Sequence, residues 1–402
     1  MAGKTIALIG ALDTKGVEYG FLRDAIEARG HNVLLIDVGI LESPVINPDE
    51  TRERVAEAAG IDLKSLIRER DRGRSVAAMS EGAAVLLPQL YAEGKFDAVM
   101  AMGGTGGTSV ACGAMRALPL GVPKVMVSTA AGTDVSGYVG VKDIVMIPSI
   151  VDVAGINKIS RRIFMQAAGA ICGMVETEVS EGTEKPLIAA TMFGNTTQAV
   201  NYAREILEYA GYEVLVFHCT GTGGLTMENL IESGQVEGVL DMTTTEWADE
   251  IAGGIFSSGP TRLEAAAKSG VPAIIAPGCL DMVNWGAPDT VPEEYKDRKF
   301  YQHNPNITLM RTTVEECCML GKVMAEKLNQ STAAVTVLLP LKGFSMIDLE
   351  GKDFYLPEAN IAFCETLKSN LYEDIKVVEM DCEINDSAFA VRCAEELLLN
   401  LK

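Results

Sequence analysis

The sequence carries an internal repeat, and this repeat constrains the fold more than any other feature. Each repeated segment holds a short apolar, β-branched run that is typical of a buried parallel strand. A shared strand-helix-strand pattern accounts for part of the similarity, but three matches in one order favour an internal duplication. We therefore expect an α/β protein of two doubly wound, flavodoxin- or Rossmann-like domains with mainly parallel sheets. The matching pairs are Ile6–Asp37 with Leu187–His218, Leu90–Met102 with Leu230–Met242, and Gly121–Val127 with Gly270–Ala276.

A polar, acidic and proline-terminated segment, residues 176–186, separates the two sets of repeats. Such a composition is typical of a linker between domains. We expect an N-terminal domain over residues 1–178, a linker over 179–186 and a C-terminal domain over 187–402. The length of 402 residues gives each domain enough chain for a core of its own.

A glycine-rich stretch follows the predicted strand that ends at Met102. Four glycines and three hydroxyl residues lie between Gly103 and Ser109, and a helix of small residues comes next. Glycines let backbone N–H groups approach an anion, and the helix N-terminus adds its positive dipole end. The alternative is a tight strand-to-helix turn that binds nothing. The density of glycines and hydroxyls favours a cradle for phosphate or carboxylate, although the stretch matches neither the P-loop nor the G-x-G-x-x-G pattern.

The turn Ala11–Gly16 should reach the same edge of the sheet, because it follows the first predicted strand. Lys15 could contact a phosphate there, and Asp13 a ribose or a metal. Alternatively, Asp13 or Thr14 simply caps the following helix. The predicted cofactor-binding residues are therefore Asp13, Thr14, Lys15, Gly103, Gly104, Thr105, Gly106, Gly107, Thr108, Ser128 and Thr129.

Polar residues also follow the predicted strands of the C-terminal domain, where they should line a second pocket facing the cleft between the halves. We expect Glu246 or Asp281 to act as a base, and Arg311 to orient a substrate carboxylate and keep nearby acids ionised. The alternatives are helix caps or a polar interface between subunits. No spacing fits zinc, so the metal stays unknown. The other predicted pocket residues are Thr196, His218, Gly223, Thr244, Asn284 and His303.

The segment Val283–Thr308 reads as one long loop that contains aromatic residues and several prolines. It exceeds the length of ordinary connections between helices and strands. We therefore expect it to be a lid or an oligomer contact.

Charge and cysteine content restrict the compartment and the partners. A net charge of −21 argues against nucleic acid and anionic membranes, because both require basic surface. The nine cysteines form no C-x-x-C pair, which is typical of reduced thiols in the cytoplasm. No signal peptide or transmembrane segment is expected. We therefore expect a soluble cytoplasmic protein with a small-molecule ligand.

Many short motifs resemble one known family over essentially the whole chain. They include ALDTKG, DRG, GGTGGTS, MRALPLGVPKVMVST, TMFGNTT, TGTGG, LDMTTTE, HNP and TLMRTT. The chain resembles the family of the amino-terminal ATP-binding domain of the tomato mosaic virus resistance protein, most of whose members are bacterial and archaeal proteins of uncharacterised activity. The resemblance implies ATP with Mg²⁺ in the N-terminal half, contacting Gly103–Thr108 and Asp13–Lys15. It also implies a homodimer or higher homo-oligomer.

The chain departs from the family pattern at two positions. Thr105 stands where the family usually has serine, which keeps the hydroxyl. Glu383 stands where the family usually has histidine, so no role is carried over to that position. Two functions stay open: an ATP-dependent enzyme acting on a small acidic or carbonyl metabolite, or a non-catalytic protein whose ATP stabilises an oligomer or a partner complex.

Overall fold

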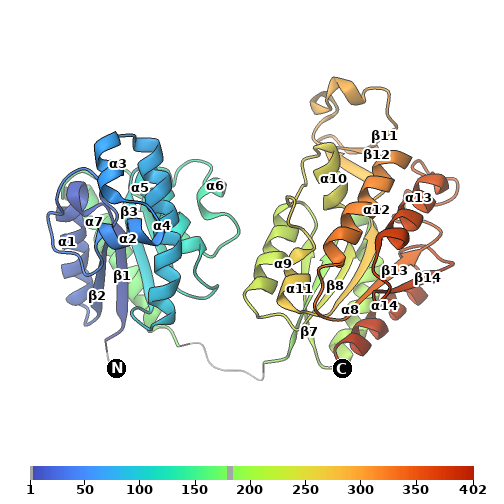
Figure 1. Ribbon diagram of the computed structural model, residues 1–402, viewed down its shortest axis with the longest axis horizontal. Coiled ribbons are helices and arrows are strands. Elements are labelled where there is room, and N and C mark those ends of the chain that lie inside the picture. The colour runs from blue at the N-terminus through green and yellow to red at the C-terminus, as the bar shows by residue number, and fades with distance from the viewer. Residues whose placement is uncertain (1–2, 179–183) are drawn as a thin grey trace. The chain divides into compact units, whose positions relative to one another are not determined.

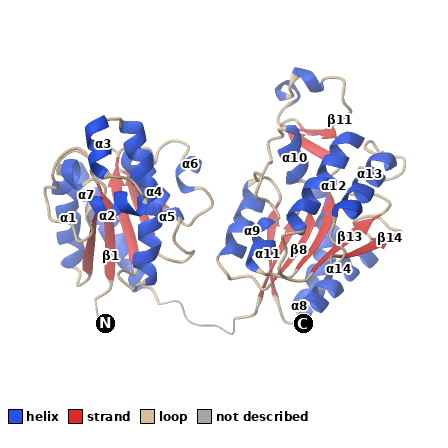
Figure 2. Ribbon diagram, viewed as in Figure 1, coloured by secondary structure: helices blue, strands red, loops and turns tan. Residues whose placement is uncertain are grey.

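The chain forms two compact α/β units, Met1–Glu181 and Gly182–Lys402. The computed structural model describes residues 3–178 and 184–402 (Figure 1). The division between the units falls within the predicted linker 179–186, of which residues 179–183 lie outside the described residues. Each unit is built around its own parallel sheet, with helices on both faces (Figure 2). The predicted fold class of two mainly parallel, doubly wound halves is therefore confirmed.

The N-terminal unit contains a five-stranded sheet with the order β2-β1-β3-β4-β5, and every pairing is parallel. Its inner strands are apolar at consecutive positions because helices cover both of their faces. The sheet strands are β1 (Thr5–Gly10), β2 (Asn32–Asp37), β3 (Ala98–Gly103), β4 (Lys124–Ser128) and β5 (Val145–Pro148).

Two hydrophobic cores lie on opposite faces of this sheet. One core packs α1 (Leu12–Glu27) and α7 (Lys158–Glu176) against the strands. The other packs α4 (Arg72–Ala92) and α5 (Thr105–Arg116) against the opposite face. Shorter helices complete the unit: α2 (Arg52–Ala58), α3 (Leu63–Glu69) and α6 (Ser136–Val139).

The C-terminal unit repeats the strand order of the first unit and extends it by one strand. Its six-stranded parallel sheet has the order β14-β13-β9-β8-β6-β7. Glycines that match between the repeats all have positive φ: Gly30 with Gly211, Gly94 with Gly234, and Gly121 with Gly270. The strands are β6 (Leu187–Met192), β7 (Glu213–His218), β8 (Gly238–Thr243), β9 (Ala273–Gly278), β13 (Val335–Pro340) and β14 (Lys376–Met380).

Helices again cover both faces of the C-terminal sheet. The helices α8 (Thr197–Tyr209) and α14 (Ser387–Asn400) share one core. The opposite core is formed by α9 (Thr222–Glu232), α10 (Glu246–Ala252), α11 (Glu264–Ser269), α12 (Val314–Leu328) and α13 (Pro357–Asn370). Three 3₁₀ turns are η1 (Gly194–Thr196), η2 (Pro288–Thr290) and η3 (Glu293–Tyr295).

The prediction that Val283–Thr308 forms one long loop is wrong, because this segment contains most of a small antiparallel sheet. This sheet has the order β10-β12-β11 and consists of β10 (Met282–Trp285), β11 (Phe300–Asn304) and β12 (Ile307–Arg311). All four residues of β10 are buried. Pairing with β12 lets this short mixed segment satisfy its backbone polar groups inside the unit.

Two predicted turns also belong to helices. The first helix begins at Leu12 instead of Val17, and its first N–H groups include one held by the Asp37 carboxylate, with Leu12 N to Asp37 Oδ1 at 3.0 Å. The glycine-rich stretch is mostly the first turn of α5, which begins at Thr105.

Candidate functional site

A cavity of 540 Å³ opens in the N-terminal unit at the carboxyl ends of β1 and β3. This is the point where the strand order changes direction, and ligands of open α/β sheets gather at such points. The volume lies within the range of typical small-molecule sites. The cavity is lined by Ala11, Asp13, Thr14, Lys15, Val38, Gly39, Ile40, Leu41, Arg70, Arg72, Ser75, Val76, Met79, Met102, Gly103, Gly104, Gly106, Gly107, Val110 and Asp152.

The first turn of α5 forms part of the cavity wall. Gly104 is the N-cap of this helix, and no side chain of the described residues accepts a hydrogen bond from its first N–H groups. The glycines there do not have positive φ. A Cβ on Gly104, Gly106 or Gly107 would meet no atom closer than 3.7 Å. Neither backbone conformation nor protein packing therefore requires glycine at these positions. Because the glycines have no side chains, space remains in front of the helix N-terminus.

Three cations and two carboxylates line the cavity, so its local charge is opposite in sign to that of the chain. Asp13 accepts backbone hydrogen bonds at both oxygens: from Thr14 N at 2.7 Å, and from Leu41 N at 2.8 Å. This carboxylate holds the loop after β2 beside the cavity. The alternative that Asp13 or Thr14 caps α1 is wrong, because the N-cap of α1 is Ala11. Lys15 Nζ donates to the carbonyl of Val153.

Of the predicted hydroxyl residues, Thr14 lines this cavity, whereas Thr105, Thr108, Ser128 and Thr129 do not. Thr108 and Ser128 are buried and hydrogen-bonded to each other at 2.7 Å between their Oγ atoms. Thr108 also donates to the carbonyl of Gly104 at 2.9 Å. Thr105 and Thr129 are exposed and do not line the cavity. The hydroxyls of Thr108 and Ser128 therefore stabilise the start of α5, whose first turn lines the cavity.

Sequence reasoning missed the two arginines of the cavity. Arg70 ends α3 with left-handed backbone geometry (φ 53°), and Arg72 is the first residue of α4. Asp71 lies between them as the N-cap of α4 and accepts a hydrogen bond from Arg74 N at 3.0 Å. The sequence signals were a charged break between two helical stretches and the DRG motif at residues 71–73, and neither reveals which charges face a cavity.

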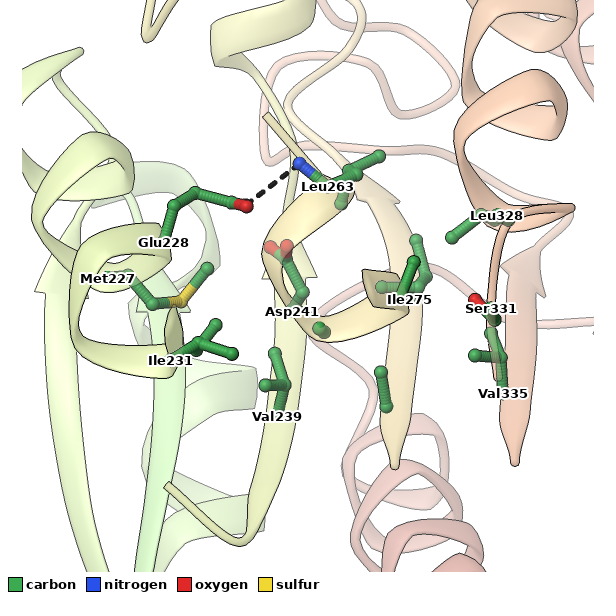
Figure 3. Close-up of a pocket in the computed structure, with 13 residues that line it drawn as sticks. Met227, Glu228, Ile231, Val239, Asp241, Leu263, Ile275, Leu328, Ser331 and Val335 are labelled. Carbon is green, nitrogen blue, oxygen red and sulfur yellow. Dashed lines mark hydrogen bonds between the residues drawn. The ribbon is translucent and has the colours of Figure 1, made fainter. Parts of the chain in front are cut away.

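The C-terminal unit offers a much smaller space. Its cavity beneath β8 and β9 has a volume of about 10 Å³, enough for a single water (Figure 3). Glu228 and Asp241 contribute carboxylates to its lining, while the Ser331 hydroxyl has no hydrogen-bond partner in the described part of the chain. Nucleotide-sized ligands do not fit such a space.

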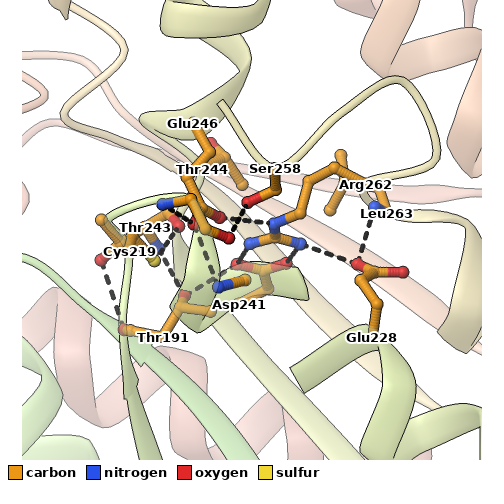
Figure 4. Close-up of polar contacts among 12 residues, drawn as sticks. Thr191, Cys219, Glu228, Asp241, Thr243, Thr244, Glu246, Ser258, Arg262 and Leu263 are labelled. Atoms are coloured by element: carbon orange, nitrogen blue, oxygen red, sulfur yellow. Dashed lines mark hydrogen bonds and ion pairs between the residues drawn. The ribbon is translucent and has the colours of Figure 1, made fainter. Parts of the chain in front are cut away.

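The predicted base Glu246 is fully buried and already has partners on both oxygens. Its Oε1 accepts from Gly221 N at 2.9 Å and Gly224 N at 3.0 Å, which caps the start of α9. Its Oε2 accepts from Arg262 Nε at 2.8 Å (Figure 4). These contacts argue against access of a substrate to Glu246. The protein's own carboxylate thus occupies the anion position at this glycine-rich helix start.

Arg262 joins three buried carboxylates and was missed by sequence reasoning. Besides Glu246, it contacts both oxygens of Asp241, at 2.5 and 2.8 Å, and Glu228 Oε1 at 3.0 Å (Figure 4). Burial alone would lower the pKa of Arg262, but Asp241 and the two glutamates hold that pKa well above its usual value. Burial raises the pKa of Glu228, although Arg262 opposes the shift.

Arg311 is likewise committed to the protein. It donates from Nε to the Phe354 carbonyl at 2.7 Å, from Nη1 to Thr312 Oγ1 at 2.6 Å and from Nη2 to Asn360 Oδ1 at 2.9 Å. A further Nη2 contact reaches Asp348 Oδ1 at 3.2 Å. This set of contacts leaves no free donor edge for a substrate carboxylate.

At Asp281, burial opposes the expected effect of Arg311, which is to keep the neighbouring acids ionised. Burial and, after it, the charge of Asp348 raise the pKa of Asp281 to about 7 against the opposing effect of Arg311. Asp281 Oδ2 accepts from Ser345 Oγ at 2.7 Å, whereas Oδ1 is buried without a partner. Desolvation therefore outweighs the guanidinium charge at this site.

The other predicted pocket residues do not form an open rim. Thr196, Thr244 and Asn284 are buried and hydrogen-bonded within the unit. A Cβ on Gly223 would overlap the His218 carbonyl, so this glycine serves packing. The side chains of His218 and His303 are exposed, and the His218 ring stacks on Phe193 with centroids 5.3 Å apart. Within residues 3–178 and 184–402, no group of three or more His, Cys, Asp or Glu side chains is arranged to hold a metal.

The two glycine-rich helix starts should respond oppositely to an added methyl group. We expect Gly224→Ala to destabilise the protein by about 1–3 kcal/mol or more, because its Cβ would overlap the Glu246 carboxylate. The Cβ of Gly107→Ala would make only an ordinary contact with the Met102 carbonyl oxygen, at 3.8 Å, so stability should be unchanged or slightly raised. Thermal unfolding of the two variants compares these cases, and equal melting temperatures would contradict the described packing.

Comparisons with known proteins agree over both units. The N-terminal domain of the uncharacterised protein family UPF0261 matches residues 4–180, and its C-terminal domain matches 185–400. A UPF0261 protein of Clostridium tetani is 50% identical over 397 residues, which are 98% of this chain and 98% of that protein. The ToMV resistance protein Tm-1(GCR237) of Solanum lycopersicum is 40% identical over 335 residues, 81% of this chain and 44% of that protein.

Solved structures resemble the chain only distantly. The UDP-GlcNAc 2-epimerase of Methanocaldococcus jannaschii in complex with UDP-GlcNAc and UDP matches with a TM-score of 0.23 and 11% identity, covering 67% of this chain and 83% of that chain. A similarity of this size carries no argument about function. Among the described helices, none combines the length and apolar character that crossing a membrane requires.

Proposed function

The chain belongs to the uncharacterised protein family UPF0261, and we propose that its N-terminal unit binds a nucleotide, ATP, through phosphate contacts at the start of α5. One observation carries this proposal: the uncapped first turn of α5 opens into a 540 Å³ cavity at the switch point of the sheet. Backbone N–H groups at a helix start favour phosphate through both hydrogen bonds and the helix dipole.

The lining of the cavity suits the two chemical ends of a nucleotide. Lys15, Arg70 and Arg72 supply positive charge for phosphates. Apolar side chains line the remaining wall and suit a base: Val38, Ile40, Leu41, Val76, Met79, Met102 and Val110. The glycines of the first turn of α5 leave a space that a Cβ would fill. Phosphate oxygens could therefore approach the backbone closely there.

A magnesium ion would depend mainly on the phosphates for its ligands. Of the two carboxylates in the lining, Asp13 already accepts hydrogen bonds from the backbone, and Asp152 lies exposed. Mg²⁺ is commonly held by one or two carboxylates together with substrate phosphates. Asp152 is therefore the residue of this chain that would hold the ion.

Non-catalytic, nucleotide-dependent binding is the second candidate function, and a specific observation favours it. The predicted base Glu246 and the predicted clamp Arg311 are buried and occupied by protein partners. We propose a homo-oligomer in the cytoplasm, in line with the family resemblance and with nine free cysteines. Light scattering of the purified chain with and without ATP tests the oligomer.

The variant Gly107→Val tests the nucleotide site. We expect it to abolish ATP binding, because its side chain would occupy the space that the phosphates need in front of the helix. The protein should stay folded, because a Cβ at this position meets only the Met102 carbonyl oxygen, at 3.8 Å. Calorimetric titration of the full chain with ATP and Mg²⁺ measures the effect.

A matched control is Gly173→Val, which makes the same change in α7, away from the cavity and with no atom near the added Cβ. It should bind ATP as the unaltered chain does. ATP affinity that survives in folded Gly107→Val would reject the site. Mass spectrometry of metabolites that copurify with the protein identifies the nucleotide independently.

A further inference from the structure

We propose that Arg72, assisted by Arg70, reads the number of phosphates on the ligand, so that the site selects nucleoside di- and triphosphates over monophosphates. This inference rests on the proposed nucleotide site and goes beyond it. The proposal concerns two residues to which the sequence analysis gave no role, and it follows from where they lie in the cavity.

The Arg72 guanidinium lies directly beside the first turn of α5. Its Nη2 is 3.7 Å from the position that a Cβ on Gly106 would take. Gly106 is the second residue of α5, so the guanidinium and the free N–H groups of this helix border the same space. One phosphate on the helix start would leave the next phosphate within reach of the arginine.

Arg72 has no partner of its own. Its side chain makes no ion pair or hydrogen bond within the part of the chain that the structure describes, whereas nearby Arg74 is paired with Glu69. The carboxylate between them, Asp71, caps the backbone of α4 through Arg74 N. A bidentate guanidinium fork without an acid is suited to a phosphate oxygen pair.

At the start of α4, the charge of Arg72 is offset only in part by the N-cap Asp71, whose carboxylate accepts a hydrogen bond from Arg74 N. Arg72 opens the 21-residue helix α4, and the first turn of that helix contains no acidic residue. A cation there opposes the positive end of the helix dipole. An anion bound between the starts of α4 and α5 would reverse this repulsion, which gives the arginine a role in binding rather than in stability.

Arg70 brings a second cation to the same wall. It follows α3 with φ 53°, a backbone conformation that non-glycine residues adopt infrequently. Only Asp71 separates it from α4, so both arginines are held by helix ends. Together with Lys15 they outnumber the cavity carboxylates, which favours ligands with more than one phosphate charge.

Calorimetric titrations of the full chain with ATP, ADP, AMP and tripolyphosphate test the proposal. The unaltered protein should bind ATP and ADP more tightly than AMP. We expect Arg72→Ala to weaken ATP and ADP by about 10- to 100-fold, as for loss of a charged hydrogen-bond pair, while AMP changes by less than about 3-fold. Arg72→Lys should retain part of the preference, because it keeps the charge but not the fork.

The control Arg74→Ala removes an equal charge from the same segment outside the cavity lining and should bind all four ligands normally. The melting temperature of ligand-free Arg72→Ala should be unchanged or raised. Undiminished ATP binding by Arg72→Ala, or an equal loss for AMP, would overturn the proposal. If nucleotides fail to bind but tripolyphosphate binds through Arg72, the nucleotide function fails and the phosphate-reading role stands; if neither binds, both fail.

Discussion

Replacing Arg262 with methionine should lower the free energy of unfolding of the C-terminal unit by about 3–5 kcal/mol, the cost of breaking a buried ion pair from one side. Arg262 is 1% exposed and is shared by Asp241, Glu246 and Glu228. Methionine fills a similar volume but donates no hydrogen bond. Three carboxylates would then lie buried without their counter-charge, although each keeps other partners.

The hydrogen bonds that these carboxylates keep should reduce the loss of stability but not abolish it. Glu228 still accepts from Leu263 N and Ala265 N, both at 2.8 Å, and Asp241 still accepts from Thr191 Oγ1 at 2.7 Å. Glu228 should take up a proton, because burial raises its pKa and the opposing charge of Arg262 is then absent. The loss of stability should therefore be greater at pH 8 than at pH 5.

Urea unfolding followed by tryptophan fluorescence measures this effect in the full chain. Both tryptophans of the sequence, Trp247 and Trp285, lie in the C-terminal unit, so the signal reports on that unit. The control Arg204→Met removes an exposed i,i+4 ion pair with Glu208 and should cost less than about 0.5 kcal/mol. A similar small loss for Arg262→Met would contradict the central role of this arginine.

The parallel strands could be predicted because a strand covered on both faces must be apolar at consecutive positions. The runs at Thr5–Gly10 and Leu187–Met192 have this property, and both are central strands. By contrast, β10 and β12 are short segments that mix apolar residues with Asn284, Thr308 and Arg311. Their burial depends on antiparallel partners and on side chains elsewhere in the chain, so no local pattern distinguishes them from a loop.

The candidate site could be predicted only in part, for a related reason. The glycine-rich start of α5 opens into a cavity. The start of α9 is also glycine-rich in sequence, but the Glu246 carboxylate occupies the space beside it. The difference is made by one carboxylate that follows another strand. Likewise, Arg262 is not at a strand end, and its three acids come from three separate elements. A residue's position at the end of a strand predicts which edge of the sheet it lies on. Whether solvent or a ligand can reach that residue depends on which side chains from other elements pack against it.

The stability of the C-terminal unit should fall as the pH rises from about 4 to 7, and Asp281→Asn should remove part of this fall. Burial raises the pKa of Asp281 to about 7 in the folded state, against about 3.9 for an unfolded aspartate. Between these values the folded chain holds a proton that the unfolded chain has lost. Stability is therefore fully present below the lower pKa and is lost as the pH approaches the higher one, by about 1.4 kcal/mol per pH unit for one such group.

The difference between Asp281→Asn and the unaltered chain isolates this group from the other acids. The amide keeps the shape and can still accept the Ser345 hydroxyl, but it never ionises. Between pH 5 and pH 8 the variant should gain about 2–3 kcal/mol relative to the unaltered chain, measured by urea unfolding with tryptophan fluorescence. Asp353→Asn, an exposed change in the same connection between β13 and α13 as Ser345, should show no such relative gain. Parallel pH profiles for the unaltered chain and Asp281→Asn would mean that Asp281 is ionised throughout and that Arg311 outweighs burial after all.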